Sequence, residues 1–316
     1  MLELTRLSQA KKFWLARVAF VVTGLSLSLN TLLSAQQTKQ KTFSSPEDAS
    51  QALFAAAQSN DESALQELFG AAGDQIISSG DEVQDKNSRD QFVARYREMH
   101  RLEREPDGTT TLYIGAENWP LPVPLIEKNG AWYFDSESGK KDILFRRIGR
   151  NELATIDVLS ALVDAQRDYY NQRTDGRPQY AQHFVSTAGT KNGLYWETSD
   201  GSPQSPIGNL IADAAREGYD KPQRDISAPF HGYFYRMLTA QGMSALGGAK
   251  SYIVNGRMTK GFAIIAYPGA YRSSGVMTFI VSRDGVIFQK DLGSSTAELA
   301  EALKTFAPDK TWHIVD

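Results

Sequence analysis

Short turn motifs between β-like segments constrain the fold of this chain more than any other feature. Asn129-Gly130, Asn255-Gly256, Pro268-Gly269 and Asp284-Gly285 each join two runs that are rich in β-branched or aromatic residues. Asparagine-glycine and aspartate-glycine pairs favour the left-handed backbone of two-residue β-hairpins. They therefore predict antiparallel sheets on both sides of a long helical pattern at residues 151–171.

Helical and strand patterns occupy separate blocks of the chain, which predicts an α+β fold. Two short helices are expected after Ser45 and after Asn60, where capping side chains precede acidic residues. The other expected helices cover residues 87–103, 151–171, 207–217 and 296–306. Strands are expected at 109–115, 119–127, 131–134, 233–238, 251–254, 262–267, 276–281 and 286–290.

The length of 316 residues suggests two domains. We expect a polar spacer at residues 36–45, an N-terminal α+β domain at 46–150 and a second α+β domain at 151–316. The chain has no cysteine, so the fold must be held by its hydrophobic core without disulfides.

Residues 1–35 have the pattern of a secretory signal, with four basic residues before the apolar run Val18 to Leu33. Ala35 is small enough for a cleavage site, but an uncleaved segment of about 20 residues could also anchor in a bilayer. The protein is therefore expected in the periplasm, or tethered to the inner membrane. Residues 1–35, if they are not cleaved, are its only expected membrane contact.

Charge and composition exclude several functions. Beyond residue 35 the chain carries 30 basic and 36 acidic residues, and this acidic balance argues against nucleic-acid binding. The histidines have no metal-ligand spacing, and no phosphate-binding or dinucleotide-binding glycine motif occurs, so neither a metal nor a cofactor is expected. The four histidines are His100, His183, His231 and His313.

Four longer strings identify a family resemblance. They are Trp119-Pro120-Leu121-Pro122, Trp132-Tyr133-Phe134-Asp135, the run from Arg146 to Leu153, and the run from Ser274 to Phe279. Together they resemble the exported bacterial family known as domain of unknown function 2950. The resemblance covers nearly all of the chain after the spacer. It implies export and a common architecture, but no catalytic residue.

Each half also resembles a known fold. The N-terminal half is similar to cystatin-like or nuclear-transport-factor-2-like domains, in which helices pack on a curved sheet. The second half, with Gly193-Leu194-Tyr195 and Gly261-Phe262-Ala263, resembles the globular domains of type IV pilins and pseudopilins. Those proteins continue an apolar N-terminal helix into the spine. Here residues 36–150 separate the apolar N-terminal segment from the helical pattern that begins at residue 151, which argues against assembly into a fibre.

Two groups of polar residues are candidate binding sites. Arg146, Arg147, Arg150 and Glu152 lie at the predicted domain junction, where arginines could clamp a carboxylate or phosphate. Nearby acidic residues predict an ion-pair network between the halves instead. The second group could form an aromatic pocket or a stacking platform, although a core strand would show the same alternation. Its members are His231, Tyr233, Tyr235, Arg236, Tyr271 and Arg272.

Three functional hypotheses follow. The preferred one is a noncatalytic envelope protein that binds another exported protein or a cell-wall component. A hydrolase would use His231 with Ser273 or Ser274 as the nucleophile. A small-ligand binding protein would use a cavity in the N-terminal domain, with Glu98 or Arg101 as its polar group.

Overall fold

The computed structural model describes residues 40–173, 176–198, 204–220 and 228–315. The predicted signal or anchor and the first four residues of the spacer lie outside them. Residues Gln40–Asp316 form one compact unit. No helix in the described part of the chain is both long and apolar enough to cross a membrane.

The N-terminal region begins with short helices packed on an antiparallel sheet. Ser45 caps α1, as predicted, by accepting a hydrogen bond from the backbone N–H of Asp48, and Asp61 caps α2 by accepting one from Ala64. The strand order is β1-β2-β4-β5, with β3 on β2. The elements are α1 (Pro46–Gln58), α2 (Glu62–Phe69), α3 (Gly73–Ile77), α4 (Glu82–Glu98), β1 (His100–Arg104), β2 (Thr110–Ile114), β3 (Trp119–Pro120), β4 (Leu125–Lys128) and β5 (Ala131–Phe134).

The helix predicted over residues 87–103 is displaced toward the N-terminus. It begins after Asp81, which caps α4, and it ends at Glu98, where Met99 turns to an extended backbone. Residues 100–104 instead form β1, which pairs antiparallel with β2. Pairing with a neighbouring strand outweighs the helical propensity of this arginine-rich and glutamate-rich segment.

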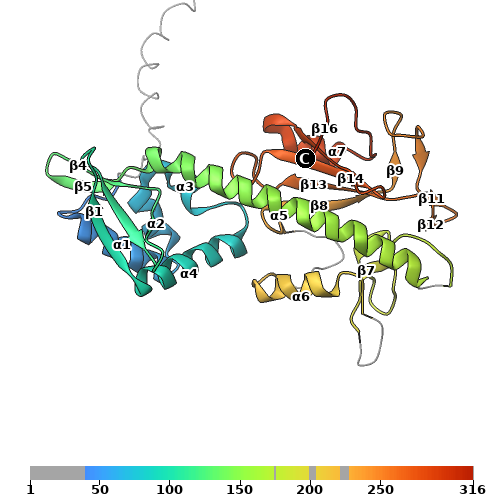
Figure 1. Ribbon diagram of the computed structural model, residues 1–316, viewed down its shortest axis with the longest axis horizontal. Coiled ribbons are helices and arrows are strands. Elements are labelled where there is room, and N and C mark those ends of the chain that lie inside the picture. Colours follow the sequence, from blue (N-terminus) through green and yellow to red (C-terminus); the bar gives the residue numbers. More distant parts are fainter. Residues whose placement is uncertain (1–39, 174–175, 199–203, 221–227, 316) are drawn as a thin grey trace, which may run out of the picture. The chain divides into compact units, whose positions relative to one another are not determined.

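A single helix, α5 (Ser136–Gln172), replaces the shorter helix predicted at 151–171. Asp135 caps it by accepting a hydrogen bond from the backbone N–H of Ser138. The predicted boundary between residues 150 and 151 therefore lies inside a helix. Figure 1 shows α5 running from the N-terminal elements to the second sheet.

The second sheet is antiparallel, and four of its five strands lie within one residue of predicted ones; β16 was not predicted, and the strand predicted at 251–254 divides between two smaller sheets. Its order is β16-β15-β14-β13-β8, and strand β13 is buried along its whole length. Leu159, Leu162 and Val163 of α5 pack in the same core as these strands. The prediction of an α+β fold is confirmed. The strands are β8 (Tyr233–Leu238), β13 (Ala263–Pro268), β14 (Met277–Ser282), β15 (Ile287–Asp291) and β16 (His313–Ile314).

Smaller elements surround the second sheet. Asn255-Gly256 turns between β11 and β12 with both residues at positive φ, and Asn129-Gly130 does the same between β4 and β5. Both predicted asparagine-glycine turns are thus confirmed. Pro268 instead ends β13, and only Gly285 of the Asp284-Gly285 pair has a positive φ. These elements are β6 (His183–Val185), β7 (Gly193–Tyr195), α6 (Gly208–Arg216), β9 (Ala240–Gln241), β10 (Lys250–Ser251), β11 (Ile253–Val254), β12 (Arg257–Met258) and α7 (Thr296–Ala302).

The end of the predicted spacer is attached to the folded unit. The Gln40 side chain donates hydrogen bonds to the carbonyls of Leu68 (2.9 Å) and Phe134 (2.7 Å). Phe43 exchanges two backbone hydrogen bonds with Trp132. Residues 40–45 therefore extend the N-terminal fold, contrary to their polar composition, because their hydrogen-bonding groups find partners on α2 and β5.

Alanine at two glycine positions of α5 is expected to change the free energy of unfolding in opposite directions. A Cβ at Gly139 would lie 2.7 Å from Cα of Val123 and 2.8 Å from the carbonyl oxygen of Pro122, whereas one at Gly149 would meet nothing within 4 Å. We expect Gly139→Ala to lower the free energy of unfolding by about 2 kcal/mol through overpacking. Gly149→Ala should raise it by about 0.5–1 kcal/mol, because alanine favours a helix. Urea denaturation of both variants tests this; equal shifts would contradict it.

Candidate functional site

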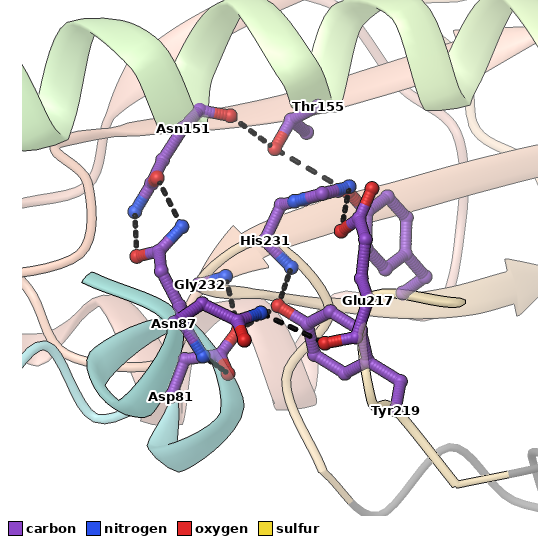
Figure 2. Close-up of polar contacts among 10 residues, drawn as sticks. Asp81, Asn87, Asn151, Thr155, Glu217, Tyr219, His231 and Gly232 are labelled. Atoms are coloured by element: carbon purple, nitrogen blue, oxygen red, sulfur yellow. Dashed lines mark hydrogen bonds and ion pairs between the residues drawn. The ribbon is translucent and has the colours of Figure 1, made fainter. Parts of the chain in front are cut away.

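A buried aspartate joins the N-terminal helices to the C-terminal region. Asp81 Oδ1 accepts the capping hydrogen bond from the backbone N–H of Gln84 (3.1 Å). Its Oδ2 accepts hydrogen bonds from the Tyr219 hydroxyl (2.8 Å) and the Gly232 backbone N–H (2.9 Å). The backbone N–H of His231 donates to the Tyr219 hydroxyl oxygen (3.3 Å). Figure 2 shows Asp81, Tyr219, His231 and Gly232 close together. We call Asp81, Gln84, Asn151, Tyr219 and Gly232 the Asp81 cluster.

An amide pair completes the Asp81 cluster on the side of α5. Gln84 Nε2 donates to Asn151 Oδ1 (2.8 Å), and Asn151 Nδ2 donates to the carbonyl of Ser274 (2.9 Å). Asn151 is completely buried. One amide on α5 thus contacts both α4 and the loop before β14, and buried amides of this kind are costly unless they are fully paired.

Electrostatics keep Tyr219 protonated. Burial and the neighbouring Asp81 carboxylate raise the pKa of Tyr219 well above its usual value. Burial also raises the pKa of Tyr235, whose hydroxyl lies 3.3 Å from the Thr155 hydroxyl. Both phenols therefore remain hydrogen-bond donors at neutral pH, and neither is suited to act as a base.

Among the arginines predicted as candidate binding residues, Arg147 alone is buried. Its guanidinium donates to the carbonyls of Gln75 (3.0 Å), Ile76 (2.7 Å) and Ser78 (3.0 Å), at the end of α3. A cation at a helix C-terminus stabilises the unpaired carbonyls and the helix dipole. Burial lowers the pKa of Arg147, while the nearby charge of Asp85 opposes this shift. The donors of Arg147 are occupied within the fold.

Asp85 supports the same segment from α4. Both oxygens of its carboxylate accept a hydrogen bond from the Ser79 N–H, at 3.0 and 2.9 Å. Burial raises the pKa of Asp85, whereas the hydrogen bonds from Ser79 and the charge of Arg147 act in the opposite direction. The loop between α3 and α4 is therefore held by groups on two helices.

The other members of the predicted junction group point elsewhere. Glu152 Oε1 accepts the backbone N–H groups of Val276 (2.9 Å) and Met277 (3.0 Å), which ties α5 to the start of β14. Arg146 forms an exposed ion pair with Asp142, and Arg150 is also exposed. The three arginines do not converge on one ligand position.

The predicted aromatic group is likewise dispersed. The Tyr233 hydroxyl donates to the carbonyl of Met277 (3.0 Å), and Arg236 donates to the carbonyls of Ala300 and Leu303 near the end of α7. Tyr271 contacts Asp291 (3.2 Å), and the Arg272 guanidinium lies 5.5 Å from the Tyr271 ring. Core packing was the preferred interpretation for Phe230 and Phe234, but these rings are only partly buried. Tyr233 and Tyr235 lie in the core instead.

His231 has an acidic neighbour in place of a serine. Its Nε2 lies 3.6 Å from the carboxylate of Glu217. Ser274 is buried and exchanges hydrogen bonds with the backbone of Ala270, while the Ser273 hydroxyl donates to Ser78. Among the described residues, no hydrogen bond joins His231 to either serine. The hydrolase hypothesis required a hydrogen bond between His231 and a loop serine, and the structure does not place these groups together.

Two further features bear on ligand binding. Glu98 and Arg101, the polar groups suggested for an N-terminal cavity, are both exposed. Within the described ranges, no group of three or more acidic, histidine or cysteine side chains is arranged to hold a metal ion. The buried polar groups of the Asp81 cluster mainly fasten α4 and α5 to the C-terminal region.

Sequence reasoning missed Asp81, Gln84, Asn151 and Tyr219. One local signal was present, because an aspartate followed three residues later by glutamine is typical of a helix start. The contacts of Asp81 with Tyr219 and Gly232 have no comparable signal, since they join positions more than 130 residues apart.

The fold and this cluster define an α+β protein in which one helix is shared by two antiparallel sheets. The chain belongs to the family described as "Protein of unknown function (DUF2950)", whose model matches residues 40–315. Searches of curated proteins and of solved structures found no match. The likenesses to cystatin-like, nuclear-transport-factor-2-like and pilin domains therefore stay predictions.

Proposed function

We infer that this chain is an exported, noncatalytic module that binds another exported protein through an exposed face of α5. The observation that carries this inference is the exposure of Phe145 (79%) and Leu153 (67%) in the middle of the helix. Gly149 lies between them, and the space above it is open. Residues four apart share a side of a helix, so the three positions form one apolar strip.

The neighbourhood of this strip has the composition of a protein interface. The half-exposed Trp119 ring lies 5.0 Å from the Arg95 guanidinium and 5.3 Å from that of Arg146, the residue next to Phe145. Tryptophan and arginine are enriched among residues that dominate binding energy. Large exposed apolar side chains on a soluble fold mark sites of interaction.

The secretory pattern of residues 1–35 supports export, and a partner from the same compartment follows from it. Either periplasmic release or a tether at the inner membrane is compatible with the strip on α5. A protein partner suits two apolar anchors on a helix better than a cell-wall glycan does, because packing anchors of this kind fill pockets on a folded partner.

Site-specific photocrosslinking tests the proposed function. With benzoylphenylalanine in place of Phe145 in the full chain in cells, we expect an adduct with one protein that itself carries a secretory signal. Leu153→Ser should reduce this adduct about tenfold, because burying a leucine at an interface is worth more than 1 kcal/mol. The adducts are identified by gel shift and mass spectrometry.

Leu299 on α7 provides the matched control, since it is also exposed. Benzoylphenylalanine at residue 299 should give no such adduct, and Leu299→Ser should leave the adduct at residue 145 unchanged. Leu153→Ser should change the free energy of unfolding by no more than about 0.5 kcal/mol. Adducts formed equally from both positions, or only with cell-wall fragments, would refute a protein-binding face on α5.

A further inference from the structure

The loop between β9 and β10 presents two apolar side chains to solvent. Met243 is 79% exposed and Leu246 is 94% exposed, the highest value among the large apolar side chains of the described residues. In Figure 1, β9 lies at the end of the second sheet that is far from β5, and α5 begins directly after β5, so the strip lies in the half of α5 nearer β5. The loop is therefore separate from the strip on α5.

Hydrogen bonds hold this loop in one conformation. The side-chain amide of Gln241 donates to the carbonyls of Leu246 (2.9 Å) and Gly248 (2.7 Å). Its oxygen accepts from the hydroxyl of the buried Tyr252 (3.2 Å). Ala245, within the loop, is buried, while the adjacent Leu246 faces solvent. Leu246 is thus exposed by an ordered scaffold.

The stretch of sequence that contains the loop carries basic but no acidic side chains. The chain contains no aspartate or glutamate from residue 226 to residue 283, although acidic residues outnumber basic ones overall. Lys250 follows the loop directly, and Lys260 follows β12; both are exposed. No ion pair engages either lysine within the part of the chain that the structure describes. An apolar tip with lysines beside it complements an anionic surface.

We propose that the loop at residues 242–249 docks on an anionic lipid bilayer. Leu246 and Met243 enter the boundary between headgroups and acyl chains, and Lys250 and Lys260 contact lipid phosphates. Apolar insertion combined with lysine attraction is the general basis of peripheral membrane binding. This contact is additional to the one predicted for residues 1–35, and it is independent of the partner proposed for α5.

The absence of cysteine allows a direct test in the full chain. Leu246→Cys is labelled with an environment-sensitive nitrobenzoxadiazole dye, and vesicles of phosphatidylglycerol and phosphatidylcholine in equal parts are added. We expect about a threefold rise in emission, and quenching by spin-labelled lipid, because the dye enters the acyl boundary. Pure phosphatidylcholine should give less than half of this rise, since lysine attraction is lost.

Two controls separate the loop from any membrane tether elsewhere in the chain. The same dye on Leu299→Cys should not respond, although residues 1–35 are identical in both proteins. Charge reversal by K250E and K260E should raise the lipid concentration needed for half of the Leu246→Cys response about tenfold. Equal responses at residues 246 and 299 would overturn the proposal. So would a response at residue 246 only on adding envelope proteins without lipid.

Discussion

Replacing Arg147 by methionine is expected to lower the free energy of unfolding by about 4 kcal/mol, because it leaves buried backbone carbonyls without donors. The guanidinium supplies hydrogen bonds to three carbonyls at the end of α3 and lies 3.4 Å from the Ser273 hydroxyl. Methionine retains most of the side-chain volume, so the loss comes from the polar contacts. Guanidinium chloride denaturation measures the change.

Arg146 offers a matched control on the same helix. It carries the same charge, but its partner Asp142 is one turn away and both side chains are more than two-fifths exposed. Arg146→Met should therefore cost no more than about 1 kcal/mol. If both variants lose the same free energy of unfolding, Arg147 stabilises the fold through its charge alone, and its hydrogen bonds to the carbonyls contribute nothing further.

Asp81→Ala is expected to lower the free energy of unfolding by about 3 kcal/mol. The substitution removes the cap of α4, which is worth about 1 kcal/mol. It also leaves the Tyr219 hydroxyl and the Gly232 N–H without their acceptor in a buried region, at about 1 kcal/mol each. Urea denaturation measures the total loss in the free energy of unfolding. Hydrogen exchange of the Gly232 N–H separately reports the loss of its hydrogen bond to Asp81.

Asp61→Ala isolates the capping contribution. Asp61 caps α2 through the backbone N–H of Ala64 (2.9 Å) in an exposed position, so its loss should cost only about 1 kcal/mol. A double-mutant cycle of Asp81→Ala with Tyr219→Phe should show a coupling of at least about 0.5 kcal/mol. Additive changes in the cycle, together with equal costs for the two aspartates, would show that Asp81 acts only as a helix cap.

The accuracy of the predicted secondary structure followed the strength of the local signals. The strand at 233–238 coincides with β8, and the hairpin turns at Asn129 and Asn255 were predicted correctly. In contrast, the first half of α5 was missed, because Gly139 and Gly149 interrupt a polar segment. Gly139 is required there by close packing on Val123, a contact that no local pattern shows.

The candidate site was predicted only in part. Arg147 and Glu152 were selected because their charges are dense in the sequence, and both make contacts that join distant elements. Their partners are backbone groups, which have no signature in the sequence. The predicted clamp of three arginines did not form, since helical geometry sends Arg147 inward and leaves Arg146 and Arg150 exposed.

By itself the sequence determined the fold class, the two asparagine-glycine turns, four strands of the second sheet and the family of this protein. These properties depend on backbone preferences and on a periodicity that neighbouring residues express together. Only the tertiary structure decided that Asp81 meets Tyr219, that Arg147 is buried and that Leu246 is exposed. Leucine has the same side chain in a core and at a loop tip. Its role depends on which distant segments cover it, and long-range packing alone determines that.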